Sequence, residues 1–190
     1  MSSPAITQRL PEGSPQPRAS LTGAVYLAYF LTAILAQLLT SRNLIFAGNA
    51  VNLISIGLYL TLALLFFRMF KPVNRSISLL AALAGIAGCL VMALGVFSPT
   101  LLPINPLWFF GIYCLFIGFL VFRSNFLPRI LGVLMILAGV GWLAFLSPAV
   151  ALHLSLYIEG LGILAEAALM LWLVVRGVNV ERWNRQAVAA

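Results

Sequence analysis

The sequence predicts an all-α membrane protein, a bundle of six transmembrane helices without a separate soluble domain. Two observations carry this prediction. Of the 190 residues, 63% are hydrophobic and only 8% are charged, whereas a soluble domain is roughly half apolar and about a quarter charged. The apolar residues also gather in six runs, each close to the roughly 20 residues that a helix needs to cross a bilayer.

Each of the six runs is predicted to be a helix. In the bilayer core the backbone must satisfy its own hydrogen bonds, so a spanning segment is a helix or a strand of a closed barrel. None of the runs shows the alternation of apolar and polar residues that is typical of a barrel strand. The predicted spans are residues 20–40, 46–67, 77–98, 106–122, 129–147 and 150–175.

Polar or proline-containing segments separate the predicted spans. Pro128 suits the first turn of the fifth helix, where its missing N–H is not needed, and Ser147-Pro148 turns the chain into the sixth. The spans together form a bundle over residues 20–176. Residues 1–19, which are rich in Pro and Ser, are predicted to be a flexible cytoplasmic tail, and residues 177–190 a short cytoplasmic tail.

The distribution of positive charge predicts the orientation. The chain has 11 Lys and Arg residues against 4 Asp and Glu residues, a net charge of +7. Ten of these cations lie on one side of the predicted spans and only Arg42 on the other. The cations that flank the loops on the charged side are Arg68, Lys71, Arg75, Arg123 and Arg129. Because cytoplasmic loops retain Lys and Arg, both termini are predicted to be cytoplasmic and the spans to lie in the plasma membrane.

The same charge bears on the partners of the protein. Basic residues beside a span favour contact with anionic lipids, at about 1 kcal/mol per residue. Nucleic-acid binding is not expected, because it needs a solvated basic face that so apolar a chain can hardly provide. The bilayer is therefore the predicted partner, and the sequence names no protein partner.

Two acidic residues lie inside a predicted span. Glu159 and Glu166 both belong to the sixth span, and no other acidic residue lies in any span. An ionisable side chain at membrane depth costs about 2.5 kcal/mol or more, so it is expected to face the interior of the bundle. A spacing of seven residues places both on one helix face. With no Lys or Arg at their depth, neutral carboxyls that donate hydrogen bonds are favoured.

Polar residues also form narrow stripes on the first two spans. Together with the two glutamates they make up the predicted buried polar site, which consists of Glu159, Glu166, Tyr26, Gln37, Asn52, Ser55 and Tyr59. We predict that spans one, two and six converge and bury these groups against one another. The alternative is a structural role, because hydrogen bonds between membrane helices contribute about 0.6 kcal/mol each on average.

Spans three to five carry small residues at helical spacing. Four such residues recur at every fourth position in the third span, and glycines recur seven apart in the fourth and fifth: Ala81, Gly85, Cys89, Ala93, Gly111, Gly118, Gly132 and Gly139. Small residues let helix backbones approach closely in lipid. These spans are therefore predicted to form a tightly packed wall without chemistry of its own.

The sequence holds no recognisable catalytic, cofactor or metal motif. His153 has no second His, Cys or acid three or four residues away, as a metal site on a helix would need. Cys89 and Cys114 lie in apolar surroundings and are predicted to be inert buried thiols. No cofactor and no enzymatic activity are therefore expected.

Several stretches resemble a bacterial membrane family catalogued as domain of unknown function 4386. The likeness is strongest where residues 122–134 read FRSNFLPRILGVL, and it extends over most of residues 20–183. It implies a multi-pass bacterial membrane protein from a family without an assigned activity. In that family the third span often carries an Arg and a Glu, where this chain has only small and apolar residues from Ala84 to Cys89. Glu166 is then the clearest ionisable group that chain and family share.

Three classes of function remain open. The first is a non-catalytic bundle that acts as a scaffold, sensor or accessory subunit, which needs only the packing and topology described above. The second is a small solute carrier or proton-linked permease that uses Glu159 and Glu166. The third is an intramembrane or lipid-directed enzyme, which is disfavoured because it would need a nucleophile with a base, or a set of metal ligands.

Overall fold

A computed structural model describes residues 15–98 and 104–188, which are helical apart from short connections. The helices are α1 (Pro15–Ser41), α2 (Ile45–Phe70), α3 (Arg75–Phe97), α4 (Leu107–Arg123), α5 (Arg129–Leu143), α6 (Pro148–Val175) and α7 (Val180–Val188), with a 3₁₀ turn η1 (Ala144–Leu146) after α5. Within the described part of the chain there is no strand. Five helices are long and apolar enough to cross a membrane, and α4 is a shorter apolar helix of 17 residues. The predicted all-α bundle with six candidate spans is confirmed.

The boundary of the predicted flexible N-terminal tail needs correction, and the predicted C-terminal tail contains a helix. Helix α1 begins at Pro15, so the end of the segment predicted as a flexible tail over residues 1–19 is helical. Proline is well tolerated in a first turn. Residues 1–14 lie outside the described part of the chain. Residues 180–188, predicted as tail, form the short helix α7.

Local chemistry explains where several helices begin and end. Between α1 and α2 the chain turns within three residues, and Asn43 takes a left-handed φ of 61°, a conformation that Asn tolerates better than most side chains. The Asn74 side chain caps α3 by accepting a hydrogen bond of 2.9 Å from the backbone N–H of Ile77. Helix α6 ends at Val175, and Gly177 just beyond it has a φ of 64°, which suits a residue without a Cβ.

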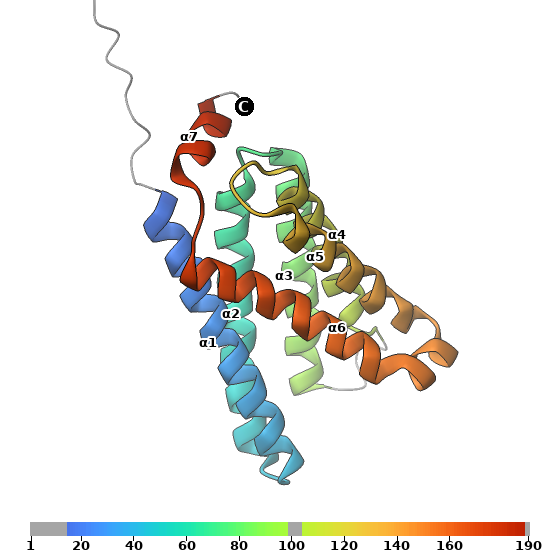
Figure 1. The fold of residues 1–190 in the computed structure, drawn as a ribbon. Helices are drawn as coiled ribbons and strands as arrows, with labels where there is room; N and C mark the ends of the chain where they lie inside the picture. The colour runs from blue at the N-terminus through green and yellow to red at the C-terminus, as the bar shows by residue number, and fades with distance from the viewer. Residues whose placement is uncertain (1–14, 99–103, 189–190) are drawn as a thin grey trace, which may run out of the picture.

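The six long helices form a ring. Each of α1 to α5 packs against the next helix along the chain, and α6 returns to pack against α1 (Figure 1). Glycine sets the closest approaches. A Cβ added to Gly23 on α1 would lie 2.8 Å from the backbone nitrogen of Val174 on α6. On α4 and α5, Gly118 and Gly132 face each other, with the Cβ position of Gly118 only 2.8 Å from the Gly132 carbonyl oxygen.

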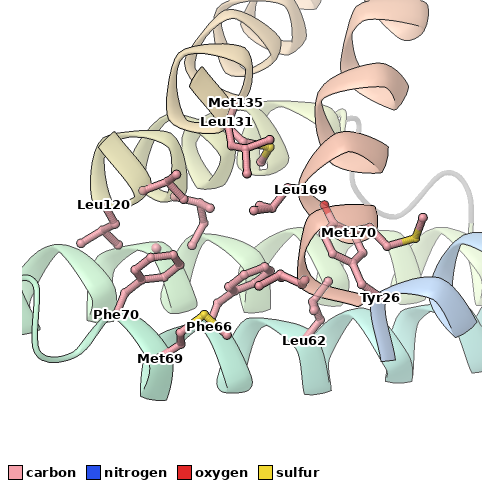
Figure 2. Packing of buried hydrophobic residues seen from close by; sticks show 14 of the residues in the cluster. Tyr26, Leu62, Phe66, Met69, Phe70, Leu120, Leu131, Met135, Leu169 and Met170 are labelled. Carbon is pink, nitrogen blue, oxygen red and sulfur yellow. The ribbon is translucent and has the colours of Figure 1, made fainter. Parts of the chain in front are cut away.

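The apolar core fills the ring between α2, α4, α5 and α6 (Figure 2). Phe66 and Phe70 of α2 stack with their ring centroids 5.8 Å apart, and Phe70 stacks in turn on Phe126 in the connection between α4 and α5. Leu120 and Leu169 close over them from α4 and α6, both fully buried. This packing seals one half of the bundle.

The sealed half adjoins the charged end of the molecule. Successive helices run in opposite directions, so α2, α4 and α6 end where α3 and α5 begin, at the end of the bundle that also holds α7 (Figure 1). We call this the basic end. In the described part of the chain, every Lys and Arg except Arg42 belongs to it. Arg42 lies in the turn between α1 and α2, at the opposite end.

Helix α7 is held against the basic end by its one buried side chain, Trp183. The indole Nε1–H donates a hydrogen bond of 3.0 Å to the carbonyl oxygen of Met69, in the last turn of α2, where carbonyls lack helical partners. The backbone N–H of Asn179 also donates to the Phe126 carbonyl at 3.3 Å. These contacts tie α7 to α2 and to the α4–α5 connection.

Replacing Trp183 with phenylalanine is expected to loosen α7. The ring would still pack, but the Met69 carbonyl would lose its donor, and a bond of this kind contributes about 1 kcal/mol. Amide hydrogen exchange over residues 180–188 is therefore expected to become about fivefold faster. Val188→Ala serves as the control, since Val188 is 79% exposed. Unchanged exchange in Trp183→Phe would show that the indole bond does not hold the helix.

Candidate functional site

A buried carboxyl lies inside the ring, on α6. The Glu166 side chain is only 9% exposed and has two neighbours with hydrogen to donate. The Tyr26 hydroxyl on α1 donates to Glu166 Oε2 at 2.9 Å, and the Cys114 thiol on α4 donates to Oε1 at 3.9 Å. Among the described residues the one ion pair is Arg185 with Glu181, so Glu166 has no cationic partner there.

The approach of α1 to α6 explains why Tyr26 reaches Glu166. Gly23, one turn before Tyr26, lets the α1 backbone lie against Leu173 and Val174 of α6. The Tyr26 ring is then fixed by Phe66, whose ring meets it edge-on at 5.9 Å, and by Phe30 at 5.5 Å. Tyr26 is 1% exposed, and this packing directs its hydroxyl to the carboxyl.

A cavity of about 320 Å³ ends at Glu166. All six long helices contribute to its wall, which consists of Tyr29, Phe30, Ala33, Ile34, Gln37, Tyr59, Met92, Leu107, Phe110, Trp142, Ile163 and Glu166. Toward the basic end it is closed by the apolar core. Its rim includes Ile34 of α1 and Ile163 of α6, which are 55% and 57% exposed. The cavity therefore opens between α1 and α6, on the flank of the bundle.

A much smaller cavity of about 30 Å³ adjoins the first and shares its Tyr29, Tyr59 and Phe110 walls. Asn52 and Ser55 line it from α2. The Ser55 hydroxyl donates back to the Val51 carbonyl at 3.1 Å. Within the described part of the protein, the Asn52 amide has no hydrogen-bond partner. The two cavities together bring most of the predicted polar residues to one interior space.

Aromatic rings dominate the wall beside the carboxyl. Tyr59 stands at the centre, with its ring centroid 4.8 Å from that of Tyr29 and 5.0 Å from that of Phe110. Trp142 adds an indole from α5, and its buried Nε1–H meets no acceptor among the residues described. The wall therefore combines the negative faces of several rings with one buried donor that has no partner.

The structure places the predicted site residues in three ways. Tyr26 and Tyr59 are buried around the cavity floor near Glu166, and Asn52 and Ser55 line the adjoining space. Gln37 lines the main cavity but is exposed, so the prediction that it is buried is wrong. Of the three spans, α1 packs against both α2 and α6.

Glu159 is not part of the buried site, contrary to the prediction. Its side chain is exposed, although it shares a helix face with Glu166. Helix α6 crosses the bundle obliquely (Figure 1), and its first turns leave the ring, where Leu156 and Tyr157 are also 77% and 75% exposed. Helix periodicity predicts which residues share a face of α6. The angle at which α6 crosses its neighbours determines how much of that face the other helices bury.

Most residues around the cavity were not part of the site predicted from the sequence, and three of them bear on its chemistry. Cys114 was expected to be an inert thiol, yet it is a neighbour of Glu166. Phe110 and Trp142 line the cavity. Nothing in the local sequence distinguishes these residues from ordinary core or interface residues, because their role depends on the packing of α4 and α5 against α6.

The described residues hold no group of three or more His, Cys, Asp or Glu side chains that could bind a metal ion. His153 is exposed near the start of α6. The chemistry that this interior offers is therefore that of one carboxyl, several hydroxyl and amide groups, and aromatic faces.

Six apolar helices are typical of a polytopic membrane protein, and in this chain they close around a cavity with a buried carboxyl. Comparison with known families confirms the resemblance predicted from the sequence over α4, α5 and α6, since residues 105–177 match the family described as Domain of unknown function (DUF4386). This segment includes Glu166, Cys114 and Trp142. The stretches of likeness before residue 105 lie outside the match.

The chain is also similar to a protein from the archaeon Archaeoglobus fulgidus that is named "Uncharacterized protein". The two are 29% identical over 131 residues, which cover 62% of this chain and 75% of the relative. No solved structure matches the chain significantly.

Proposed function

We propose that the protein is a small membrane carrier that binds an amphiphilic organic cation in the cavity ending at Glu166. The observation that carries this proposal is the cavity itself. At about 320 Å³ it falls within the range of about 300–1,000 Å³ that is usual for small-molecule sites. A purely structural bundle has no need of such a space beside a buried carboxyl.

The chemistry of the wall supports a cation as the ligand. In its ionised form the Glu166 carboxylate attracts positive charge, and no described Lys or Arg neutralises it. Tyr29, Tyr59 and Trp142 supply aromatic faces, which attract an ammonium group by about 0.5–2 kcal/mol each. Tyr26 and Cys114 hold the carboxyl in place, so little rotamer freedom is lost when a ligand binds.

The position of the opening supports an amphiphile. The rim residues Ile34 and Ile163 are exposed apolar side chains on the flanks of α1 and α6, where a bilayer would surround them. A ligand with an apolar body can reach the opening from the lipid, and the Gln37 amide at the rim offers it a polar contact.

The proposal includes an orientation in the plasma membrane of a bacterium. The basic end, with Arg68, Lys71, Arg75, Arg123 and Arg129, is placed in the cytoplasm because Lys and Arg are retained there. Both termini are then cytoplasmic, and the cavity belongs to the outer half of the bilayer. The sequence favoured a scaffold, sensor or accessory subunit. The cavity supports the carrier alternative, now with Glu166 alone as the buried acid.

Binding of benzyltrimethylammonium, compared with its uncharged isostere neopentylbenzene, tests the proposal. We expect the purified protein to bind the cation more tightly by isothermal titration. Glu166→Gln is expected to weaken cation binding by about tenfold to a hundredfold, the value of a hydrogen-bonded or charged contact, and to leave binding of the isostere unchanged. The glutamine can still accept the Tyr26 hydrogen bond. Glu159→Gln, which removes an exposed acid from the same helix, is the matched control.

Transport is measured separately, as uptake of the labelled cation into proteoliposomes compared with empty liposomes. Uptake that Glu166→Gln abolishes supports a carrier. Binding without uptake would overturn the transport step, and equal binding by wild type and Glu166→Gln would overturn the site. If benzyltrimethylammonium does not bind to the wild type, the carrier proposal is overturned and a non-catalytic scaffold becomes the favoured function.

A further inference from the structure

A second pocket, of about 370 Å³, lies at the basic end and is unrelated to the Glu166 cavity. Its lining residues come from the α2–α3 connection, α4, α5 and α7: Val73, Phe122, Arg123, Arg129 and Gln186. The geometry points to a binding site for the phosphate group of an anionic phospholipid. Four separate segments of the chain meet here, so the pocket exists only in the folded protein.

The polar groups of this pocket are donors. Arg123 and Arg129 each present a guanidinium, which binds phosphate oxygens through paired N–H groups. The Gln186 Oε1 already accepts a hydrogen bond of 3.2 Å from the backbone N–H of Asn125, which leaves its amide N–H₂ group for the pocket. A site of two guanidinium groups and an amide donor selects an anion.

No carboxylate of the described residues neutralises these charges. Among the described acids, Glu181 pairs with Arg185 at 3.5 Å on the exposed side of α7, and Glu159 and Glu166 both belong to α6. None of these acids lines the pocket. The two arginines therefore keep their full charge for an external ligand.

Aromatic rings position both guanidinium groups. The Arg123 Cζ lies 5.9 Å from the centroid of the Phe119 ring, and the Arg129 Cζ lies 5.9 Å from that of Phe122. Cation–π contact of this kind limits the motion of an exposed arginine. The pocket is thus partly organised before a ligand arrives.

The surroundings favour a lipid as the source of the phosphate. The pocket lies where α4 ends and α5 begins, at the level where the apolar helices give way to charged residues. Phe122 and Ile130 beside it are 42% and 62% exposed, so they offer an apolar flank to acyl chains. Basic pockets between membrane helices are a recognised kind of site for anionic headgroups.

The contribution of Gln186 links this pocket to α7. Helix α7 is fixed by the Trp183–Met69 contact and, one turn later, by the Gln186–Asn125 contact. A headgroup that contacts Gln186, Arg123 and Arg129 would connect α7 with α4 and α5. Lipid binding is therefore expected to slow amide exchange in residues 180–188.

The test uses the detergent-purified full chain and three soluble probes: dioctanoyl phosphatidylglycerol, dioctanoyl phosphatidylcholine and inorganic phosphate. The pocket variant is Arg123→Gln with Arg129→Gln. The charge-matched control is Arg75→Gln with Arg176→Gln, which removes two arginines from the same end but outside the pocket. Binding is followed by native mass spectrometry and by hydrogen exchange of α7.

We expect the wild type to bind phosphatidylglycerol in preference to phosphatidylcholine. At about fivefold per arginine, the pocket variant is expected to bind it about thirtyfold more weakly, while the control variant keeps most of its affinity. If inorganic phosphate binds as tightly as phosphatidylglycerol, the site is one for a soluble phosphate, and the proposal that a lipid supplies the phosphate group is overturned. An equal loss of phosphatidylglycerol affinity in the pocket variant and the control variant would overturn the proposed site. It would show that the lipid is attracted to the basic end as a whole and not to this pocket. The melting temperature of each variant is measured in parallel without lipid, so that a loss of binding is not confused with unfolding of the variant.

Discussion

Gly132→Ala is expected to destabilise the bundle strongly, because it increases the separation between α4 and α5. A Cβ at this position would lie 2.6 Å from the backbone nitrogen of Phe122 and 2.7 Å from the carbonyl oxygen of Gly118. Both contacts are with backbone atoms, so no side chain can rotate away and the helices themselves must move. Overpacking in a close-packed interior costs about 1–3 kcal/mol, and the rigidity of both neighbours places this substitution near the upper end of that range.

The measurement is the free energy of unfolding in mixed micelles, with Gly95→Ala on α3 as the control. An added Cβ at Gly95 meets nothing within 4 Å, and replacing a helical glycine by alanine is worth about 0.5–1 kcal/mol in favour of the helix. The two variants are therefore expected to change stability in opposite directions. Equal stability of Gly132→Ala and the wild type would contradict the close approach of α4 and α5.

Ala33→Phe is expected to weaken binding at the small-molecule site while leaving its carboxyl intact. Ala33 lines both the main and the adjoining cavity, so a phenyl ring there occupies the space that a ligand needs. If the ligand must displace that ring, the steric cost of about 1–3 kcal/mol corresponds to an affinity about fivefold to 150-fold lower. Titration with benzyltrimethylammonium measures the effect.

Ala24→Phe is the matched control, because Ala24 is on the same helix but exposed. The Tyr26–Glu166 hydrogen bond should persist in both variants. Ala33→Phe is expected to weaken the binding of benzyltrimethylammonium and of its neutral isostere alike, because it removes cavity volume and not charge. Glu166→Gln, in contrast, is expected to weaken only the binding of the cation. Unchanged affinity in Ala33→Phe would mean that the probe binds elsewhere.

The helices could be predicted from the sequence because the bilayer imposes a simple local rule. A run of apolar residues of sufficient length has to form a helix, and all six runs do. Helix α7 was not predicted, because it is stabilised by tertiary contacts and not by a long run of apolar residues. It is nine residues long, buries a single tryptophan, and depends on the Met69 carbonyl 114 positions earlier in the chain.

The polar interior could be predicted only in part. The burial of Tyr26 and Glu166 in one interior followed from the polar stripe on α1 and from the cost of a carboxyl at membrane depth, which are local properties of α1 and α6. The exposure of Glu159 and Gln37 did not, because it depends on how far the two helices diverge beyond their crossing. Cys114 gave no signal at all, since a cysteine beside a carboxyl differs from a core cysteine only through its three-dimensional neighbours.

The closure of the ring by α1 and α6 has a consequence for biosynthesis. Tyr26 and Glu166 are 140 residues apart, and the helices that carry them are the first and the last of the six to leave the ribosome. Until α6 inserts, the face of α1 that holds Gly23 and Tyr26 has only lipid or α2 beside it. The carboxyl and its hydroxyl partner therefore meet only after α6 has inserted, and a chain truncated after α5 should insert without ever forming the site.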